Sequence, residues 1–69
     1  MVFAHEHLQE RRVLAGLSRS ELARRTGTTR ESIRRYETGA STPRPSTAMA
    51  LAAALTIPPA DLWTRELAA

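Results

Sequence analysis

The sequence contains no cysteine, so it can form neither a disulfide nor a thiolate metal site, and it carries no thiol nucleophile. This absence is consistent with the reducing cytoplasm. No apolar run is long enough to span a membrane, because the longest one, residues 48–57, is interrupted by Thr56 and falls short of about 20 residues. The N-terminal residues combine no basic segment with an apolar one, so we expect no signal peptide.

Groups that would support catalysis or hold a cofactor are also missing. We find no credible Ser/His/Asp or Cys/His set, no glycine-rich phosphate loop and no pair of catalytic carboxylates, so we expect neither an enzyme nor a cofactor. His5 and His7 are two positions apart, diverge on a helix and do not form an H-E-x-x-H motif. We therefore expect no metal site.

Lysine is absent too, so the ten basic residues are all arginines, and the formal net charge is +3. Seven arginines but only three acidic residues lie between Arg19 and Arg44, which gives this segment a net charge of +4 and leaves −1 elsewhere. A basic charge confined to one segment is typical of a surface that binds nucleic acid. A solvated face of an arginine-rich chain would look similar, so charge alone does not decide.

Helix-forming residues dominate, and no segment alternates like a strand, so we expect an all-α fold. Glycines and prolines divide residues 1–69 into five helices of one domain, at about residues 5–15, 19–26, 30–38, 47–55 and 60–67. A capping box at residues 18–21 opens the second helix, Thr28 or Thr29 caps the third, and Ser46 or Thr47 caps the fourth.

The apolar residues fit this division into a compact five-helix bundle. Those expected to share the core are Leu17, Leu22 and Ala23, then Met49, Leu51 and Leu55 along the fourth helix, and Leu62 and Trp63 at the fifth.

Residues 18–39 read SRSELARRTGTTRESIRRYETG, two short helices joined by a turn that contains Gly27. The pattern predicts a helix-turn-helix, in which the second helix lies in the major groove of DNA while the first crosses the backbone. Ala23 is small enough for the two helices to approach closely, and Gly27 can adopt a positive φ in the turn. Ile33 projects from the second helix into the core.

From residue 8 to residue 63 the sequence resembles the phage repressor and Cro-type (XRE-like) family of helix-turn-helix regulators. The elements that carry the resemblance are Arg12, Gly16-Leu17-Ser18, Glu21-Leu22-Ala23, Gly27-Thr28-Thr29, Ser32-Ile33, Tyr36-Glu37, Gly39, Leu51, Leu55 and Leu62. It implies a five-helix, lambda-repressor-like domain that binds DNA and regulates transcription. The sequence departs from the family at Arg19, where relatives usually have Gln, and at Arg11, where they tend to have an apolar residue.

The second helix of the motif presents one face to DNA. With Ile33 toward the core and an advance of about 100° per residue, Glu37 falls on the core side while Glu31 and Arg35 lie nearly opposite. The predicted base-contacting residues are Arg30, Glu31, Arg34 and Arg35. Because Arg can donate two hydrogen bonds to guanine and Glu can accept one from cytosine, we expect a half-site with G·C pairs.

Two acidic residues have alternatives to this scheme. Glu31 could pair with Arg35 or complete a second capping box with Thr28, and in either case it would not reach a base. The resemblance implies that Glu37 forms an ion pair with Arg12, which would tie the first helix to the third; otherwise both ends would be solvated separately.

Other residues are assigned to the DNA backbone or to the motif itself. The predicted phosphate-contacting residues are Arg19, Thr29, Ser41, Thr42 and Arg44. The predicted structural residues are Arg12, Ala23, Gly27, Ile33 and Glu37. We expect Arg24 and Arg25 to be solvated.

The expected partner is a palindromic double-stranded DNA operator, bound by a homodimer that blocks the promoter. We assign the dimer surface to residues 63–67 with neighbouring residues of the last two helices. Three alternatives keep the fold but change the role: an antitoxin that binds a toxin protein, a restriction–modification controller protein, and a domain that contacts only proteins. The local arginine excess argues against the last.

Overall fold

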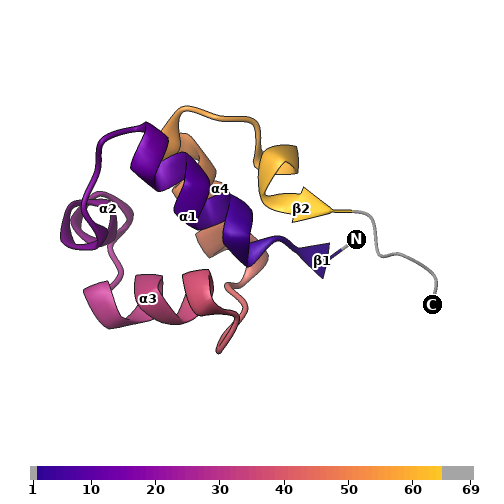
Figure 1. Cartoon of the computed structure of the whole chain (residues 1–69), viewed down its shortest axis with the longest axis horizontal. Coiled ribbons are helices and arrows are strands. Elements are labelled where there is room, and N and C mark those ends of the chain that lie inside the picture. Colours follow the sequence, from indigo (N-terminus) through magenta and orange to yellow (C-terminus); the bar gives the residue numbers. More distant parts are fainter. Residues whose placement is uncertain (1, 65–69) are drawn as a thin grey trace.

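The structure, a computed structural model, describes residues 2–64 and consists mainly of four α-helices. In chain order the elements are β1 (Val2–Phe3), α1 (His5–Leu14), α2 (Arg19–Thr26), α3 (Arg30–Thr38), α4 (Pro45–Leu55), the 3₁₀ helix η1 (Pro59–Leu62) and β2 (Trp63–Thr64). Helix α3 packs against α1 and α2, while α4 packs against α2 and η1 (Figure 1). The predicted helical class is confirmed, but the prediction of five α-helices is wrong.

The core lies where these helices meet. One fully buried large side chain comes from each of the four α-helices and from η1, and they are Leu8, Leu22, Ile33, Leu51 and Leu62. Ala23 and Ala52 are also buried in this cluster, and their small side chains let α2 and α4 approach their neighbours closely. Burial of such side chains is the main favourable contribution to folding in a chain of this size.

Two predictions are wrong at the end of the described chain. Residues 60–67 were expected to form a helix, and no strand was expected. After η1, Trp63 is extended and pairs with Phe3 in an antiparallel ribbon, in which the two rings meet edge to face at 5.4 Å. Each two-residue strand gains its hydrogen bonds from a segment at the other end of the chain, which no local pattern reveals. Residues 65–67 of the predicted helix lie outside the described residues.

Helix α4 corrects two further predictions. It begins at Pro45, after Arg44 as the N-cap residue, and not after a cap from Ser46 or Thr47. Proline suits the first turn because its φ is already helical and its missing N–H would have no partner there. Met49, predicted in the core, is 61% exposed, because the buried face of α4 instead follows the spacing of Ala48, Leu51, Ala52 and Leu55.

A glycine turn ends α3 and sets the path of the following loop. Gly39 has φ +83°, in the left-handed region, and its α-carbon faces the ring of His5 at the start of α1. A β-carbon at this position would lie 3.2 Å from the nearest ring atom. Both the backbone conformation and the close approach therefore favour glycine here.

We predict that Gly39→Ala lowers the free energy of unfolding by more than Gly16→Ala does. Gly16 has a similar φ of +72° but open space around its α-carbon, so its substitution introduces only backbone strain, about 1–2 kcal/mol. Urea denaturation of both variants measures the difference. Adding His5→Ala to Gly39→Ala should recover the excess loss, and equal losses in the two single variants would show that the His5 ring imposes no constraint.

Candidate nucleic-acid interface

The helix-turn-helix is built by local signals that act as predicted. Ser18 and Glu21 form the capping box of α2: the Ser18 Oγ accepts from the Glu21 N–H at 3.1 Å, and Glu21 Oε1 accepts from the Ser18 N–H at 3.2 Å. This Ser18 backbone donor is also the main reason that the pKa of Glu21 lies below its ordinary value. Gly27 ends α2 at φ +68°, and Thr29 caps α3 by accepting from the Ser32 N–H.

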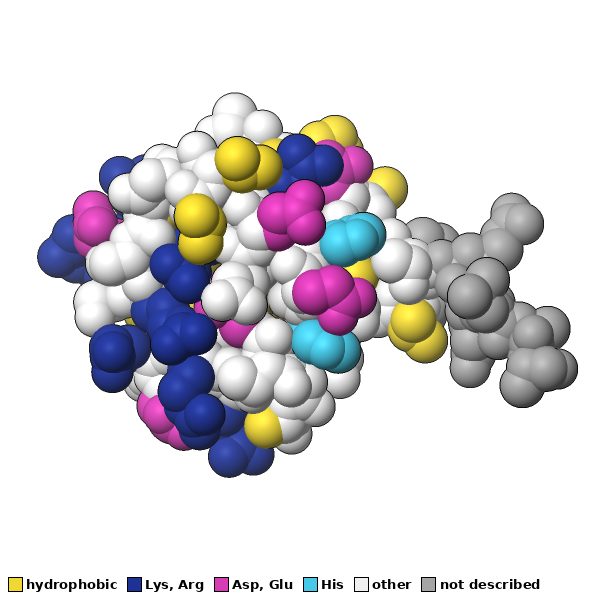
Figure 2. All heavy atoms as spheres, viewed as in Figure 1, with side chains coloured by type: hydrophobic (Ala, Val, Ile, Leu, Met, Phe, Trp, Pro, Cys, Tyr) yellow, Lys and Arg dark blue, Asp and Glu magenta, His cyan; other side chains and the backbone are white. Residues whose placement is uncertain are grey.

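Helix α3 separates core from surface as its periodicity predicts. Ile33 is fully buried and Glu37 is 3% exposed, so both face α1 and α2. The four predicted base-contacting residues are all exposed: Arg30, Glu31, Arg34 and Arg35. Most of the arginines gather on one side of the molecule, over α2 and α3 (Figure 2). The structure thus brings these side chains together on one outer face, and their contact with bases stays a prediction.

Glu31 takes neither of its two expected local partners. Its carboxylate accepts from Arg34, with Nε–Oε1 at 2.9 Å and Nη2–Oε2 at 2.6 Å. The pairing with Arg35 and the capping box with Thr28 are therefore wrong, the latter because Thr29 is the cap. The Arg34 hydrogen bonds hold the pKa of Glu31 below its ordinary value, and they raise that of Arg34.

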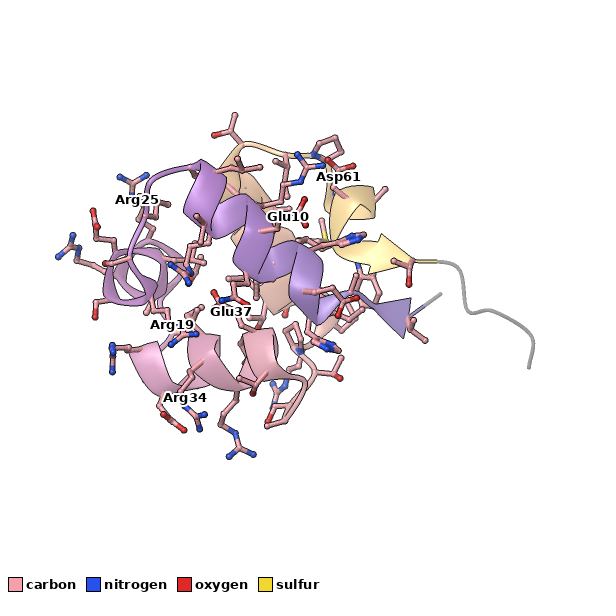
Figure 3. All side chains as sticks on the ribbon, in the orientation of Figure 1. Glu10, Arg19, Arg25, Arg34, Glu37 and Asp61 are labelled. Carbon is pink, nitrogen blue, oxygen red and sulfur yellow. The ribbon has the colours of Figure 1, made fainter. Side chains whose placement is uncertain are left out.

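The buried carboxylate of Glu37 lies between α1, α2 and α3 (Figure 3). Arg12 donates to it from Nε at 2.6 Å and from Nη2 at 3.2 Å, so the predicted Arg12–Glu37 ion pair is present. The remaining nitrogen of Arg12, Nη1, donates to the Leu17 carbonyl at 2.9 Å. Arg19 also donates to Glu37, from Nε to Oε1 at 3.0 Å, a contact that the sequence did not predict.

The predicted phosphate-contacting residues lie in α2, at the N-cap of α3 and in the segment between α3 and α4. The side chain of Arg19 stays 28% exposed although its Nε is bound to Glu37. Thr29 uses its hydroxyl as the cap of α3, whereas Thr42 and Arg44 are exposed in the loop before α4. Ser41 in the same loop accepts a hydrogen bond from Arg35 Nε at 3.0 Å, which sequence reasoning also missed.

Other kinds of site find little support among residues 2–64. No cluster of three or more His, Cys, Asp or Glu side chains is placed to hold a metal ion there. His7 contacts the Asp61 carbonyl through Nδ1 at 3.1 Å, while the His5 ring lies against Gly39. Arg11, which departs from the family pattern, lies half-exposed beside Asp61 at 3.5 Å and so needs no place in the core. Each helix in this part of the chain is too short or too polar for a transmembrane span.

Comparison with known proteins agrees with this geometry. A family model described as helix-turn-helix matches residues 8–62. The chain therefore belongs to the helix-turn-helix family of phage repressor and Cro-type regulators, a class of DNA-binding transcription regulators.

Two solved structures share the fold. The restriction–modification controller protein C.AhdI from Aeromonas hydrophila is 32% identical, over 86% of this chain and 89% of that chain, with a TM-score of 0.82. The P22 c2 repressor in complex with a synthetic operator is 22% identical, over 90% of this chain and 94% of that chain, with the same TM-score of 0.82. A search of the curated proteins gave no significant match.

We predict that Glu37→Gln lowers the free energy of unfolding by about 3 kcal/mol, because it leaves Arg12 largely buried without a counter-charge. Arg19→Gln removes the more exposed partner of the same carboxylate and should cost about 1 kcal/mol or less. Denaturant unfolding of both variants tests this. Similar losses would mean that Glu37 stabilises the protein mainly through Arg19, with little contribution from Arg12.

We further predict that a carboxyl NMR titration of Glu31 gives a pKa below the ordinary glutamate range, and that Arg34→Ala raises it. Arg24→Ala, which removes an exposed arginine of α2, serves as the control and should leave Glu31 unchanged. Because the pKa is lowered in the folded state, the pair stabilises the protein near neutral pH, and this contribution is lost as the pH falls through the lowered pKa. An unchanged Glu31 titration in Arg34→Ala would contradict the pairing.

Proposed function

We propose that this protein is a sequence-specific DNA-binding regulator that reads a G·C-containing operator through α3. The observation that carries the proposal is the outer face of α3, where Arg30, Arg34 and Arg35 are exposed on a helix-turn-helix framework. A helix of this kind fits the major groove, in which guanine offers two acceptors to an arginine. Each well-placed pair of this kind contributes about 1–3 kcal/mol of discrimination against other bases.

Within this scheme the roles are divided by geometry. Arg30 and Arg35 read guanine, and Glu31 accepts from cytosine once Arg34 turns toward a phosphate or a base. The DNA backbone is contacted by the predicted phosphate-contacting residues Arg19, Thr29, Ser41, Thr42 and Arg44. These contacts fix the orientation of α3 in the groove and carry no sequence information of their own.

Regulation would follow from occupancy of the operator. Two copies of the chain would read half-sites about 34 Å apart on a palindromic operator, as helix-turn-helix dimers do. The bound homodimer would cover promoter DNA, exclude polymerase and so repress transcription. This function needs neither catalysis nor a cofactor, and residues 1–69 would serve it as one DNA-binding domain. A protein with this function would act in the cytoplasm, on the DNA of the nucleoid.

A second candidate role is that of a controller protein in a restriction–modification system. The 32% identity to C.AhdI over most of both chains favours it. Such a protein would read DNA in the same way but would regulate its own operon together with a nuclease gene. An antitoxin role remains an alternative, and it would require a toxin partner. The genes adjacent to this one distinguish the three roles.

Selection of binding sites from a random duplex library tests the proposal, with wild type and Arg35→Ala side by side. We expect wild type to enrich a two-fold symmetric site with G·C pairs, and Arg35→Ala to lose discrimination at one pair in each half-site by about tenfold or more. Arg24→Ala, on the solvated side of α2, should keep the wild-type preference. If nothing is enriched and binding only fades with added salt, the arginines form a generic phosphate-binding surface.

A further inference from the structure

The arginines of α3 differ in how the protein holds them. Arg34 donates from both Nε and Nη2 to Glu31, so one edge of its guanidinium is already occupied. Arg35 donates only from Nε, to Ser41 Oγ, which leaves both terminal nitrogens without a protein acceptor among residues 2–64. These two nitrogens are the pair that can donate side by side to O6 and N7 of a guanine. Arg35 is therefore held at its stem while its recognition end stays available.

Ser41 also forms a hydrogen bond to Arg35 through the backbone. Its N–H donates to the Arg35 carbonyl at 3.2 Å, so a backbone and a side-chain hydrogen bond join Ser41 to one residue of α3. The glycine turn at Gly39 reverses the chain to bring Ser41 there, and the buried Pro43 anchors the loop two residues later. The position of Ser41 therefore follows from the fold and not from a chance surface contact.

The hydroxyl of Ser41 has one proton of its own to donate. Since Oγ accepts from Arg35, that proton points away from the guanidinium, and no acceptor for it is present among residues 2–64. A phosphate oxygen of DNA bound to α3 would supply an acceptor on this exposed side. A single serine would then join a phosphate contact to the side chain that reads a base.

We propose that Ser41 is a positioning residue for base recognition: it holds the Arg35 guanidinium in the orientation that reads guanine, although it touches no base itself. The proposal rests on the proposed function. An arginine side chain has several rotatable bonds, and a partner that fixes its stem reduces the conformational freedom lost when it binds a base. Discrimination at the base pair read by Arg35 should therefore depend on residue 41.

Binding measurements on the selected site test this. We would measure Kd for the selected duplex and for duplexes substituted at the Arg35-dependent pair, using wild type, Ser41→Ala, Ser41→Thr, Arg35→Ala and the double variant Arg35→Ala/Ser41→Ala. Ser41→Ala should reduce discrimination at that pair about three- to tenfold, the usual effect of losing one hydrogen bond. Ser41→Thr, which keeps the hydroxyl, should retain the preference. Ser20→Ala, an exposed serine of α2, is the matched control.

Each outcome decides a separate point. The proposal is supported if Ser41→Ala reduces discrimination in the wild-type protein but causes no further reduction when Arg35 is already alanine. Equal weakening of all duplexes overturns it, because Ser41 is then only a phosphate contact. If wild type enriches a site but Arg35→Ala discriminates normally, the proposal fails while the proposed function stands. If wild type enriches no site, both fail together.

An NMR measurement on the free protein tests the positioning without DNA. The Arg35 Nε–H signal should exchange slowly with water in wild type and rapidly in Ser41→Ala, while the backbone amide spectrum shows that both are folded. Unchanged exchange of this one proton would overturn the proposal.

Discussion

The arrangement of the helix-turn-helix depends on the ion pairs formed by the buried carboxylate of Glu37. This carboxylate is buried on the inner side of α3 and binds Arg12 from α1 and Arg19 from α2, so a single charge joins three helices. A buried carboxylate is unfavourable unless charged donors surround it, and here three guanidinium nitrogens do so. The arrangement of helices that satisfies this charge also turns the outer face of α3 to the surface.

The cluster of Glu37, Arg12 and Arg19 also affects the electrostatic potential at the proposed DNA interface. Arg12 is almost wholly enclosed and balances the charge of Glu37, which leaves Arg19 as an additional positive charge at the edge of the cluster. Without these arginines, the negative charge of Glu37 beneath the outer face of α3 would repel DNA. Because the arginines outnumber the carboxylate, the inner side of α3 adds a net positive charge beneath the exposed arginines.

The boundaries of α2 and α3 were predictable from sequence because their signals are local. The capping residues Ser18 and Thr29 and the glycines after each helix act within a few positions of where they stand. The outer face of α3 was predictable for the same reason, since periodicity alone separates Ile33 from Arg35. The Arg12–Glu37 pair followed from family resemblance, because nothing local relates residues on different helices.

What could not be predicted depends on contacts between distant segments or on competition between neighbours. The strand at Trp63 forms only because Phe3 lies opposite, so its sequence alone was read as helix. Three arginines lie within four positions of Glu31, and their spacing alone does not show that Arg34 is the one that pairs with it. The hydrogen bond of Arg35 to Ser41 requires the path of the chain after Gly39, which sequence patterns do not specify.

The ribbon of β1 and β2 also has a consequence for the order of folding. Its partners come from opposite ends of the described chain, so pairing them closes a loop that contains every helix. Loop closure of this kind costs more entropy than the short connections between consecutive helices, and helices that have already packed shorten the distance to be closed. The ribbon should therefore form last, and its two strands, which depend on each other for hydrogen bonds, should open together while the helix-turn-helix remains folded.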